Sequence, residues 1–179
     1  MKIKSLFFML SAFLALAASS CTQQAADLKD AEIQSNKDSS AKWIWYPETE
    51  DEAQNQNRYF SKKFVIESDI ESAKLFVTAD DSCKIYINGK ISERLPGQNG
   101  DWKVVKTHDI GKVLRKGENL IAAEVKNSGG AAGLILRLEI ISKDGKKSNL
   151  FSDVSWLCSK QVQTGWESSL LQDQTWISV

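Results

Sequence analysis

Acidic and amide side chains recur in several loops of this sequence, and one carboxylate stands directly before a tryptophan. Carboxylates and amides exchange hydrogen bonds with sugar hydroxyls, and an indole face stacks on the C–H surface of a pyranose ring. The same oxygen atoms could coordinate Ca²⁺, which takes about six to eight oxygen ligands. Alternatively, the paired aspartates only form a turn. The candidate ligand-binding set comprises Asp80, Asp81, Asn99, Asp101, Trp102 and Asn127.

Alternating apolar and polar residues predict the strands that carry these loops. The alternation is clear over residues 73–79, 83–87 and 134–141, and Asn88-Gly89 is typical of a type I′ hairpin turn. Strand-like segments recur about every eight to twelve residues, with turn residues between them and no long helical pattern. The sequence therefore predicts an all-β fold, an antiparallel two-sheet sandwich of jelly-roll type.

The order of the strands also predicts where the loops lie. If every connection reverses the chain direction, alternate loops lie at the same end of the sandwich. Loops 46–57, 80–82, 92–101 and 126–132 then share one end, and these loops, with Trp102 directly after the third, contain the candidate set. We therefore expect one ligand-binding end, whereas the acids of the first loop are expected to form a solvated surface.

The first 41 residues carry targeting signals rather than a fold. Residues 1–20 have the features of a secretory signal peptide, with two lysines followed by a short apolar stretch. Ala18-Ser19-Ser20-Cys21 resembles a bacterial lipobox, which implies cleavage before Cys21 and its lipidation; the alternative is an ordinary signal peptide that leaves a free thiol. Residues 21–41 are poor in large apolar residues and predict a flexible tether. The sandwich is expected over residues 42–179, held at the bacterial cell envelope on the outer membrane or a periplasm-facing membrane.

Charge and motif content argue against several classes of function. The chain has 23 Lys and Arg and 23 Asp and Glu, without the basic face that nucleic-acid binding requires. His108 is the single histidine and lacks the partners of a metal site or a catalytic triad, so it is expected to be a strand residue near the surface or the partner of a nearby acid. We therefore expect no enzyme and no organic cofactor.

Two cysteines remain once Cys21 is set aside. Cys83 and Cys158 both alternate with residues that predict an inward-facing position. An oxidising envelope permits a disulfide between them, but buried free thiols are also common. The sequence leaves the two alternatives open, because spacing along the chain does not establish disulfide geometry.

Several segments together resemble one known family. They are WIW, YFSKKF, LFVTADDSCKIYINGK, DIGKVLRKGENLIAAEVKN, GLILRLEI and the closing FSDVSW…GW…QDQTW. Over residues 43–179 they resemble the galactose-binding-like β-sandwich module at the amino-terminal side of bacterial α-L-rhamnosidases and related secreted glycosidases. In those enzymes a helical catalytic barrel follows the module, whereas this sequence stops at Val179. The resemblance therefore implies the module's fold and an accessory role, without hydrolase activity.

These observations predict a non-catalytic, lipid-anchored sandwich that binds carbohydrate at the envelope. The alternative is a structural or protein-interaction lipoprotein without a sugar site, which could dock onto an envelope protein such as a separate glycoside hydrolase. The sugar-binding hypothesis predicts an exposed Trp102 beside Asp80 and Asp81. The interaction hypothesis predicts a broad apolar patch on a sheet face instead.

Overall fold

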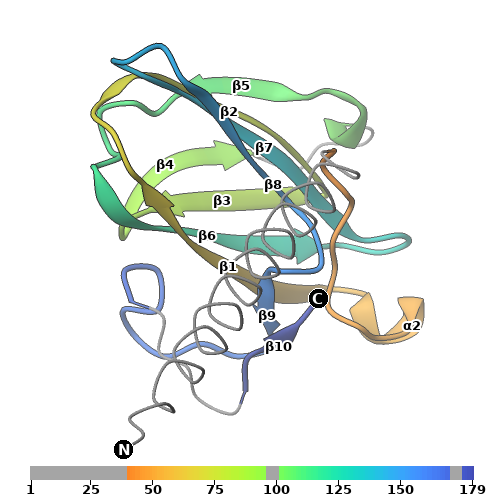
Figure 1. The fold of residues 1–179 in the computed structure, drawn as a ribbon. Helices are drawn as coiled ribbons and strands as arrows, with labels where there is room; N and C mark the ends of the chain where they lie inside the picture. Colours follow the sequence, from red (N-terminus) through yellow and green to blue (C-terminus); the bar gives the residue numbers. More distant parts are fainter. Residues whose placement is uncertain (1–39, 96–100, 170–174) are drawn as a thin grey trace, which may run out of the picture. The chain divides into compact units, whose positions relative to one another are not determined.

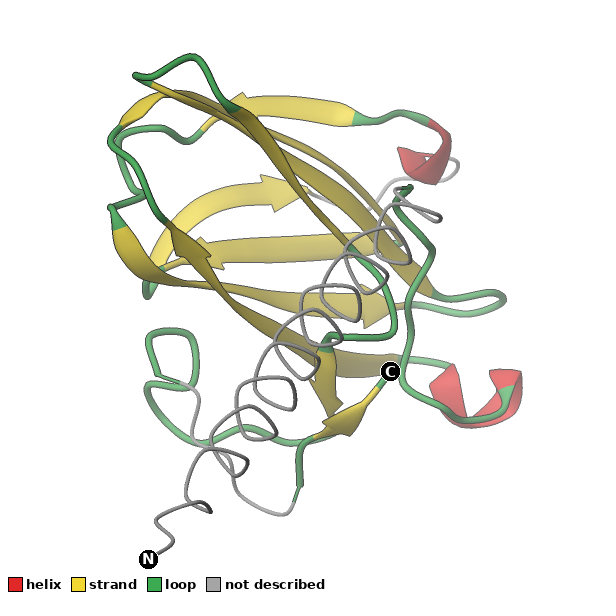
Figure 2. Cartoon of the chain, in the orientation of Figure 1, coloured by secondary structure: helices red, strands yellow, loops and turns green. Residues whose placement is uncertain are grey.

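Two antiparallel sheets pack face to face in the part of the chain that the structure describes, residues 40–95, 101–169 and 175–179 of a computed structural model (Figure 1). One sheet has the strand order β10-β9-β1-β6-β3-β4, and the other has the order β5-β2-β7-β8. Helical structure in the described residues is confined to two short segments (Figure 2), α2 (Glu50–Ala53) and the 3-10 turn η1 (Asp101–Lys103). The predicted all-β two-sheet sandwich is confirmed.

The strands have the following bounds. The six-stranded sheet contains β1 (Gln56–Ile66), β3 (Ser82–Ile87), β4 (Lys90–Leu95), β6 (Gly117–Asn127), β9 (Leu157–Ser159) and β10 (Ile177–Ser178). The four-stranded sheet contains β2 (Ile70–Asp80), β5 (Lys106–Asp109), β7 (Gly133–Ser142) and β8 (Lys147–Phe151).

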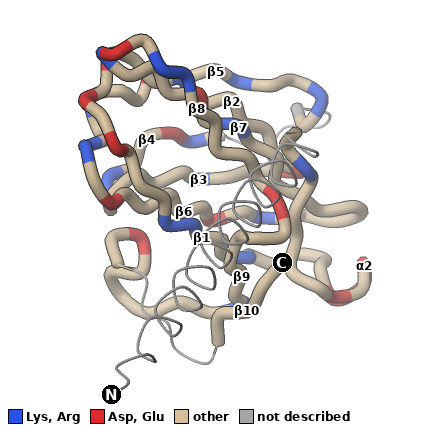
Figure 3. The backbone as a smooth tube through the Cα atoms, viewed as in Figure 1, with Lys and Arg blue, Asp and Glu red and all other residues tan. Residues whose placement is uncertain are grey.

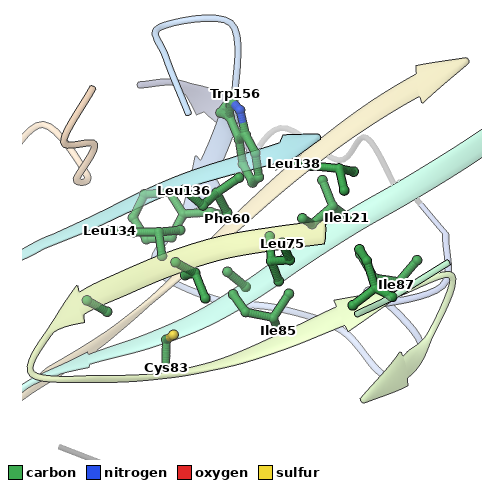
Figure 4. Close-up of a cluster of buried hydrophobic side chains, with 14 of the residues drawn as sticks. Phe60, Leu75, Cys83, Ile85, Ile87, Ile121, Leu134, Leu136, Leu138 and Trp156 are labelled. Atoms are coloured by element: carbon green, nitrogen blue, oxygen red, sulfur yellow. The ribbon is translucent and has the colours of Figure 1, made fainter. Parts of the chain in front are cut away.

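The core lies between the sheets and explains the alternation in the sequence. On β7, Leu134, Leu136 and Leu138 are buried, while the residues between them are less buried. They pack with fully buried side chains of the opposite sheet such as Phe60 and Ile85 (Figure 4). Each such side chain contributes roughly 1.5–3 kcal/mol through removal of apolar surface from water. This shared core fixes both sheets, and with them the loops at the sheet ends.

Strand register places the predicted loops at one end of the sandwich. In the six-stranded sheet, Ser82 pairs with Lys126, and Gln56 pairs with Asn127. In the four-stranded sheet, Asp80 pairs with Gly133. The chain passes from one sheet to the other between Asp80 and Ser82, so these pairs lie at a common end. The loop arrangement predicted from strand order is confirmed for the described residues.

The hairpin between β3 and β4 also forms as predicted. Asn88 and Gly89 adopt φ values of 52° and 81°, which the type I′ turn requires at both positions. The Asn88 side chain then donates to the Val113 carbonyl and to Asn119 Oδ1. Asn88 therefore both forms the turn and links this hairpin by hydrogen bonds to the 113–119 connection.

Trp166, which follows β9, covers part of the outer face of the six-stranded sheet. Trp166 packs edge-on against Tyr59 and Tyr86, with ring centroids 5.2 and 5.8 Å apart, and Trp176 stacks on it at 5.9 Å. We call Tyr59, Tyr86, Trp166 and Trp176 the aromatic cluster. Two of the six tryptophans therefore pack outside the core between the sheets.

The two ends of the folded unit, residues 41–179, are both hydrogen-bonded to the connection between β8 and β9. The Lys42 N–H donates to the Ser152 carbonyl, and the Val179 N–H donates to the Trp156 carbonyl. Ser152 and Trp156 are four residues apart, on either side of a turn in which the Trp156 N–H bonds the Asp153 carbonyl. Both ends are therefore fastened to the same short connection between β8 and β9.

The disulfide alternative for Cys83 and Cys158 is wrong, because both are buried free thiols. Cys158 pairs with Phe60, Phe60 with Ala123, and Ala123 with Ile85, so β9 and β3 are three strand spacings apart. That separation is about 14 Å, twice the Cα distance of about 7 Å that a disulfide can bridge. Burial raises the pKa of the Cys83 thiol to about 12 and that of Cys158 to about 11.

Candidate functional site

Asp80 stands at the end of β2, where the chain leaves the four-stranded sheet. Its carboxyl is half-buried, and burial, followed by the neighbouring Asp81 charge, raises the pKa of Asp80. Asp81 instead fastens the glycine-rich loop: its N–H donates to the Lys126 carbonyl, and its Oδ2 accepts from the Ser128 N–H at 2.6 Å. The two aspartates therefore have different roles, and Asp80 is the one that faces a pocket.

Trp102 lies beside Asp80 on the turn η1. The Thr78 hydroxyl of β2 donates to the Trp102 carbonyl at 3.1 Å, which holds η1 against the four-stranded sheet. The indole remains 42% exposed, with the Lys103 ammonium 5.1 Å from its ring centroid. The sequence-based prediction of an exposed Trp102 near Asp80 matches this arrangement.

Trp43 supplies a second exposed indole. The next residue, Ile44, is buried and forms a two-bond bridge with Leu134 of β7, which turns Trp43 outward. The Trp43 ring lies against Gly133 and is 47% exposed. The alternation in Trp43-Ile44-Trp45 was the signal for this orientation, but the sequence analysis did not place Trp43 in the site.

The two indoles and the Asp80 carboxyl line one pocket of about 260 Å³. Ala131 and Ala132 complete its wall, and their small side chains leave room between the rings. We call it the two-tryptophan pocket. Its volume is slightly below that of typical small-molecule sites, which start near about 300 Å³, so it suits one compact ring. Exposed indole faces can stack on such a ring while the carboxylate accepts hydrogen bonds from its hydroxyls.

The other predicted site residues do not all reach this pocket. Asn127 is completely buried, its amide donates to the Ala53 and Gly130 carbonyls, and its oxygen accepts from the Gly129 N–H. The ligand-binding role predicted for Asn127 is therefore corrected to a structural one, because it has no exposed surface. Asp101 begins η1, while Asn99 and Cys21 lie outside the described residues.

Glu50, Asp51 and Glu52 of the first loop are exposed, as expected, but Glu48 belongs to a buried ion network. Glu48 accepts two hydrogen bonds of 2.7 Å from Arg58, one of 3.1 Å from Trp45 Nε1 and a salt bridge of 3.0 Å from Lys160. Burial alone would raise the pKa of Glu48, but the bonds from Arg58 and Lys160 outweigh it and lower the pKa. Both oxygens of the Glu48 carboxylate are engaged by partners within the protein, so Glu48 holds the loop rather than a ligand.

Neither a metal-binding cluster nor a membrane-spanning helix is found among the described residues, and the histidine pairs with an acid. Within residues 40–95, 101–169 and 175–179, no three His, Cys, Asp or Glu side chains converge as a metal site. In the same ranges, no helix has the length and apolarity needed to cross a bilayer. His108 Nδ1 lies 2.6 Å from Glu93 Oε2, so it is the partner of an acid, as expected.

Comparison with known proteins places this fold in a class. No protein-family model matches the chain. The lectin of Pleurotus ostreatus, solved in complex with GalNAc, aligns with a TM-score of 0.68 at 25% identity over 77% of this chain and 40% of the lectin. The fold is thus a β-sandwich of the carbohydrate-binding type.

Two alpha-L-rhamnosidases are among the sequence relatives of this chain. That of Streptomyces avermitilis is 29% identical over 140 residues, or 75% of this chain and 14% of the enzyme. Its crystal structure with L-rhamnose has a TM-score of 0.71 at 27% identity over 77% of this chain and 14% of the enzyme. The enzyme of Formosa agariphila is 28% identical over 153 residues, 70% of this chain and 16% of the enzyme. The chain therefore resembles one domain of alpha-L-rhamnosidases, as predicted, and spans about a seventh of these curated relatives.

Proposed function

We propose that this protein is a non-catalytic carbohydrate-binding module, lipid-anchored through Cys21 at the bacterial envelope, with the two-tryptophan pocket as its sugar site. The observation that carries the proposal is the pocket itself: two exposed indoles, Trp43 and Trp102, flank the Asp80 carboxyl. The likeness to a GalNAc-bound lectin and to a domain of sugar-cleaving enzymes supports a saccharide ligand.

Absence of catalysis is part of the proposal. The matched region covers only 14% to 16% of the rhamnosidases, which is the size of one accessory domain. Asp80 supplies one carboxyl among the described lining residues of the pocket, whereas glycoside hydrolysis ordinarily uses two that flank the scissile bond. A rhamnosidase assay on the purified protein should therefore show no turnover.

A glycan array tests the binding proposal. The protein should bind a restricted set of glycans, and Trp102→Ala should abolish that binding without loss of the folded state. Val65→Ala is the matched control, because Val65 is also an exposed apolar residue but does not line the pocket. Retained binding in Trp102→Ala would overturn the assigned site, and a blank array with folded protein would overturn the function.

The protein-interaction alternative has one specific observation in its favour. Val104 and Val105 are exposed and follow Trp102 in the chain, which extends the apolar surface beyond the pocket. Such a surface could dock onto an envelope protein, including a separate glycoside hydrolase. Substituting Val104 and Val105 by Ser separates the two functions: glycan binding should persist, whereas protein docking should be lost.

A further inference from the structure

The two-tryptophan pocket contains a carboxyl that has no basic partner. Basic and acidic positions are interspersed along the described backbone (Figure 3), so most acids have a basic residue nearby. Among the described residues that line this pocket, however, Asp80 is the one charged side chain, and the others are Trp43, Trp102, Ala131 and Ala132. Asp80 forms no salt bridge with any described residue. The negative charge of the pocket is therefore not compensated within the described part of the chain.

Asp81 adds to this negative charge. Its Oδ2 accepts a hydrogen bond from the Ser128 N–H, which is a neutral donor and leaves the charge of the Asp81 carboxylate in place. Burial, followed by the Asp81 charge, raises the pKa of Asp80, because both disfavour the ionised carboxylate. A neutral sugar hydroxyl can donate a hydrogen bond to Asp80, but it does not remove the repulsion between the two carboxylates. A positive charge beside Asp80 offsets both the repulsion and the cost of burial.

The two indoles of the pocket also suit a positive charge. The face of an indole is electrostatically negative and attracts an ammonium group within about 6 Å of the ring centroid. The Lys103 ammonium lies 5.1 Å from the centroid of the Trp102 ring, so this indole already makes one such contact. Lys103 is not among the residues that line the pocket. Among the described residues, no Lys or Arg lies over the Trp43 ring. The pocket therefore combines aromatic faces with a carboxylate and leaves the cation to a ligand.

We infer that the ligand is an amino sugar, whose protonated amine pairs with the Asp80 carboxylate in the two-tryptophan pocket while the sugar ring contacts Trp43 and Trp102. An ammonium donor and a carboxylate acceptor form a hydrogen bond roughly twice as strong as one between neutral groups. The volume of about 260 Å³ admits one pyranose ring, which carries the amine and the C–H surface together. This inference rests on the proposed function and names its ligand class.

Calorimetric titration of the purified protein with a β-1,4-linked glucosamine trimer and with the matching glucose trimer tests the inference. The two trimers differ in the ammonium group that replaces one hydroxyl of each ring. At a pH between the pKa of Asp80 and that of the amines, the glucosamine trimer should bind about tenfold more tightly, and the difference should shrink as salt is raised. Asp80→Asn should remove this preference, so that the two trimers bind about equally. Glu118→Gln, which removes an exposed negative charge near the start of β6 at the other end of the sandwich, should leave the preference intact.

The outcomes separate the inference from the proposed function. Equal binding of the two trimers that still depends on Trp102, or a glycan array on which only neutral glycans bind, overturns the amino-sugar inference and keeps the sugar site. A preference for the glucosamine trimer that persists in Asp80→Asn also overturns the inference. Choline carries an ammonium without a sugar ring and should bind more weakly than the glucosamine trimer; tighter binding of choline overturns both proposals. Failure of both trimers, together with a blank glycan array, overturns the proposed function itself.

Discussion

A Cβ atom on Gly133 would lie 2.6 Å from Cε3 of Trp43, so the indole rests against the start of β7 only because residue 133 has no side chain. Atoms cannot approach that closely without displacement. The small residue on one strand therefore sets the position of an exposed ring on another segment. This contact links the core strand β7 directly to the wall of the two-tryptophan pocket.

Gly133→Ala should weaken sugar binding by displacing Trp43, while the two sheets remain paired. We expect a loss of about tenfold in affinity, measured by titration with an array-positive glycan, because one of two stacking rings moves. Gly111→Ala is the matched control: its added Cβ would meet Ala73 N at 3.4 Å, an ordinary contact. Unchanged affinity in Gly133→Ala, with a folded protein, would remove Trp43 from the site.

Asp80 should make the stability of the fold decrease as pH rises from acid toward neutral. Burial, followed by the charge of Asp81, raises the pKa of Asp80 above 3.8. The unfolded chain therefore releases this proton at lower pH than the folded chain, and the free energy of unfolding falls from about pH 3.8 up to the raised pKa. The Asp80→Asn variant has no carboxyl to titrate at this position. Urea unfolding at several pH values should therefore show that the free energy of unfolding of the variant rises relative to that of the wild type between about pH 3.8 and the raised pKa.

Asp144→Asn supplies a control of opposite sign. Hydrogen bonds from the Lys146 N–H and the Ser68 hydroxyl lower the pKa of Asp144, so its ionised form stabilises the fold above pH 3.8. The free energy of unfolding of the Asp144→Asn variant should therefore decrease relative to that of the wild type as pH rises. Divergence of both variants in the same direction would contradict the environment assigned to Asp80.

Glu48→Gln should cost about 3 kcal/mol of unfolding free energy, because it leaves Arg58 buried without its anion. Urea unfolding near neutral pH measures the change. The matched control is Glu118→Gln, which breaks the exposed pair with Lys63 at 3.4 Å and should cost less than about 1 kcal/mol. Equal losses in the two variants would show that the Glu48 network is not a special anchor.

Cys21→Ser should release the protein from the membrane fraction. The lipobox-like residues before Cys21 predict a thioether-linked lipid, and several acyl chains give stable membrane anchoring. Metabolic labelling with radioactive palmitate should mark the wild type and not the variant, and detergent phase partition should follow the label. An unlabelled wild type found in the soluble fraction would favour the ordinary signal peptide.

The cysteines of the sandwich should behave as buried thiols. Ellman's reagent should leave Cys83 and Cys158 unmodified in the folded protein and react with both in urea, since burial raises the pKa of each thiol. A reducing agent should leave the unfolding midpoint unchanged. Slow release of thiols only after reduction would indicate a disulfide instead.

Local sequence patterns were enough to predict the strands and the common end of their loops. Asn88-Gly89 determines its own turn, and strand order alone brings Asp80 and Trp102 to the same end. The predictions that failed concern residues whose partners lie far away in the sequence. Asn127 is buried because its amide meets the Ala53 carbonyl, 74 residues earlier, and Glu48 is buried because Arg58 and Lys160 converge on it. Tertiary packing determines these partners, and local patterns such as alternation and turn residues carry no information about it.

The fastening of Lys42 and Val179 to one connection has a consequence for modularity. Their partners, Ser152 and Trp156, are separated by at most about 14 Å of chain, so the polypeptide arrives and departs at neighbouring points of the sandwich. A short linker between residues 179 and 41 should permit circular permutation, with new termini at the exposed turn 143–146. For the same reason, the folded unit could be inserted into a surface loop of a host protein without distortion of the unit or of the host loop.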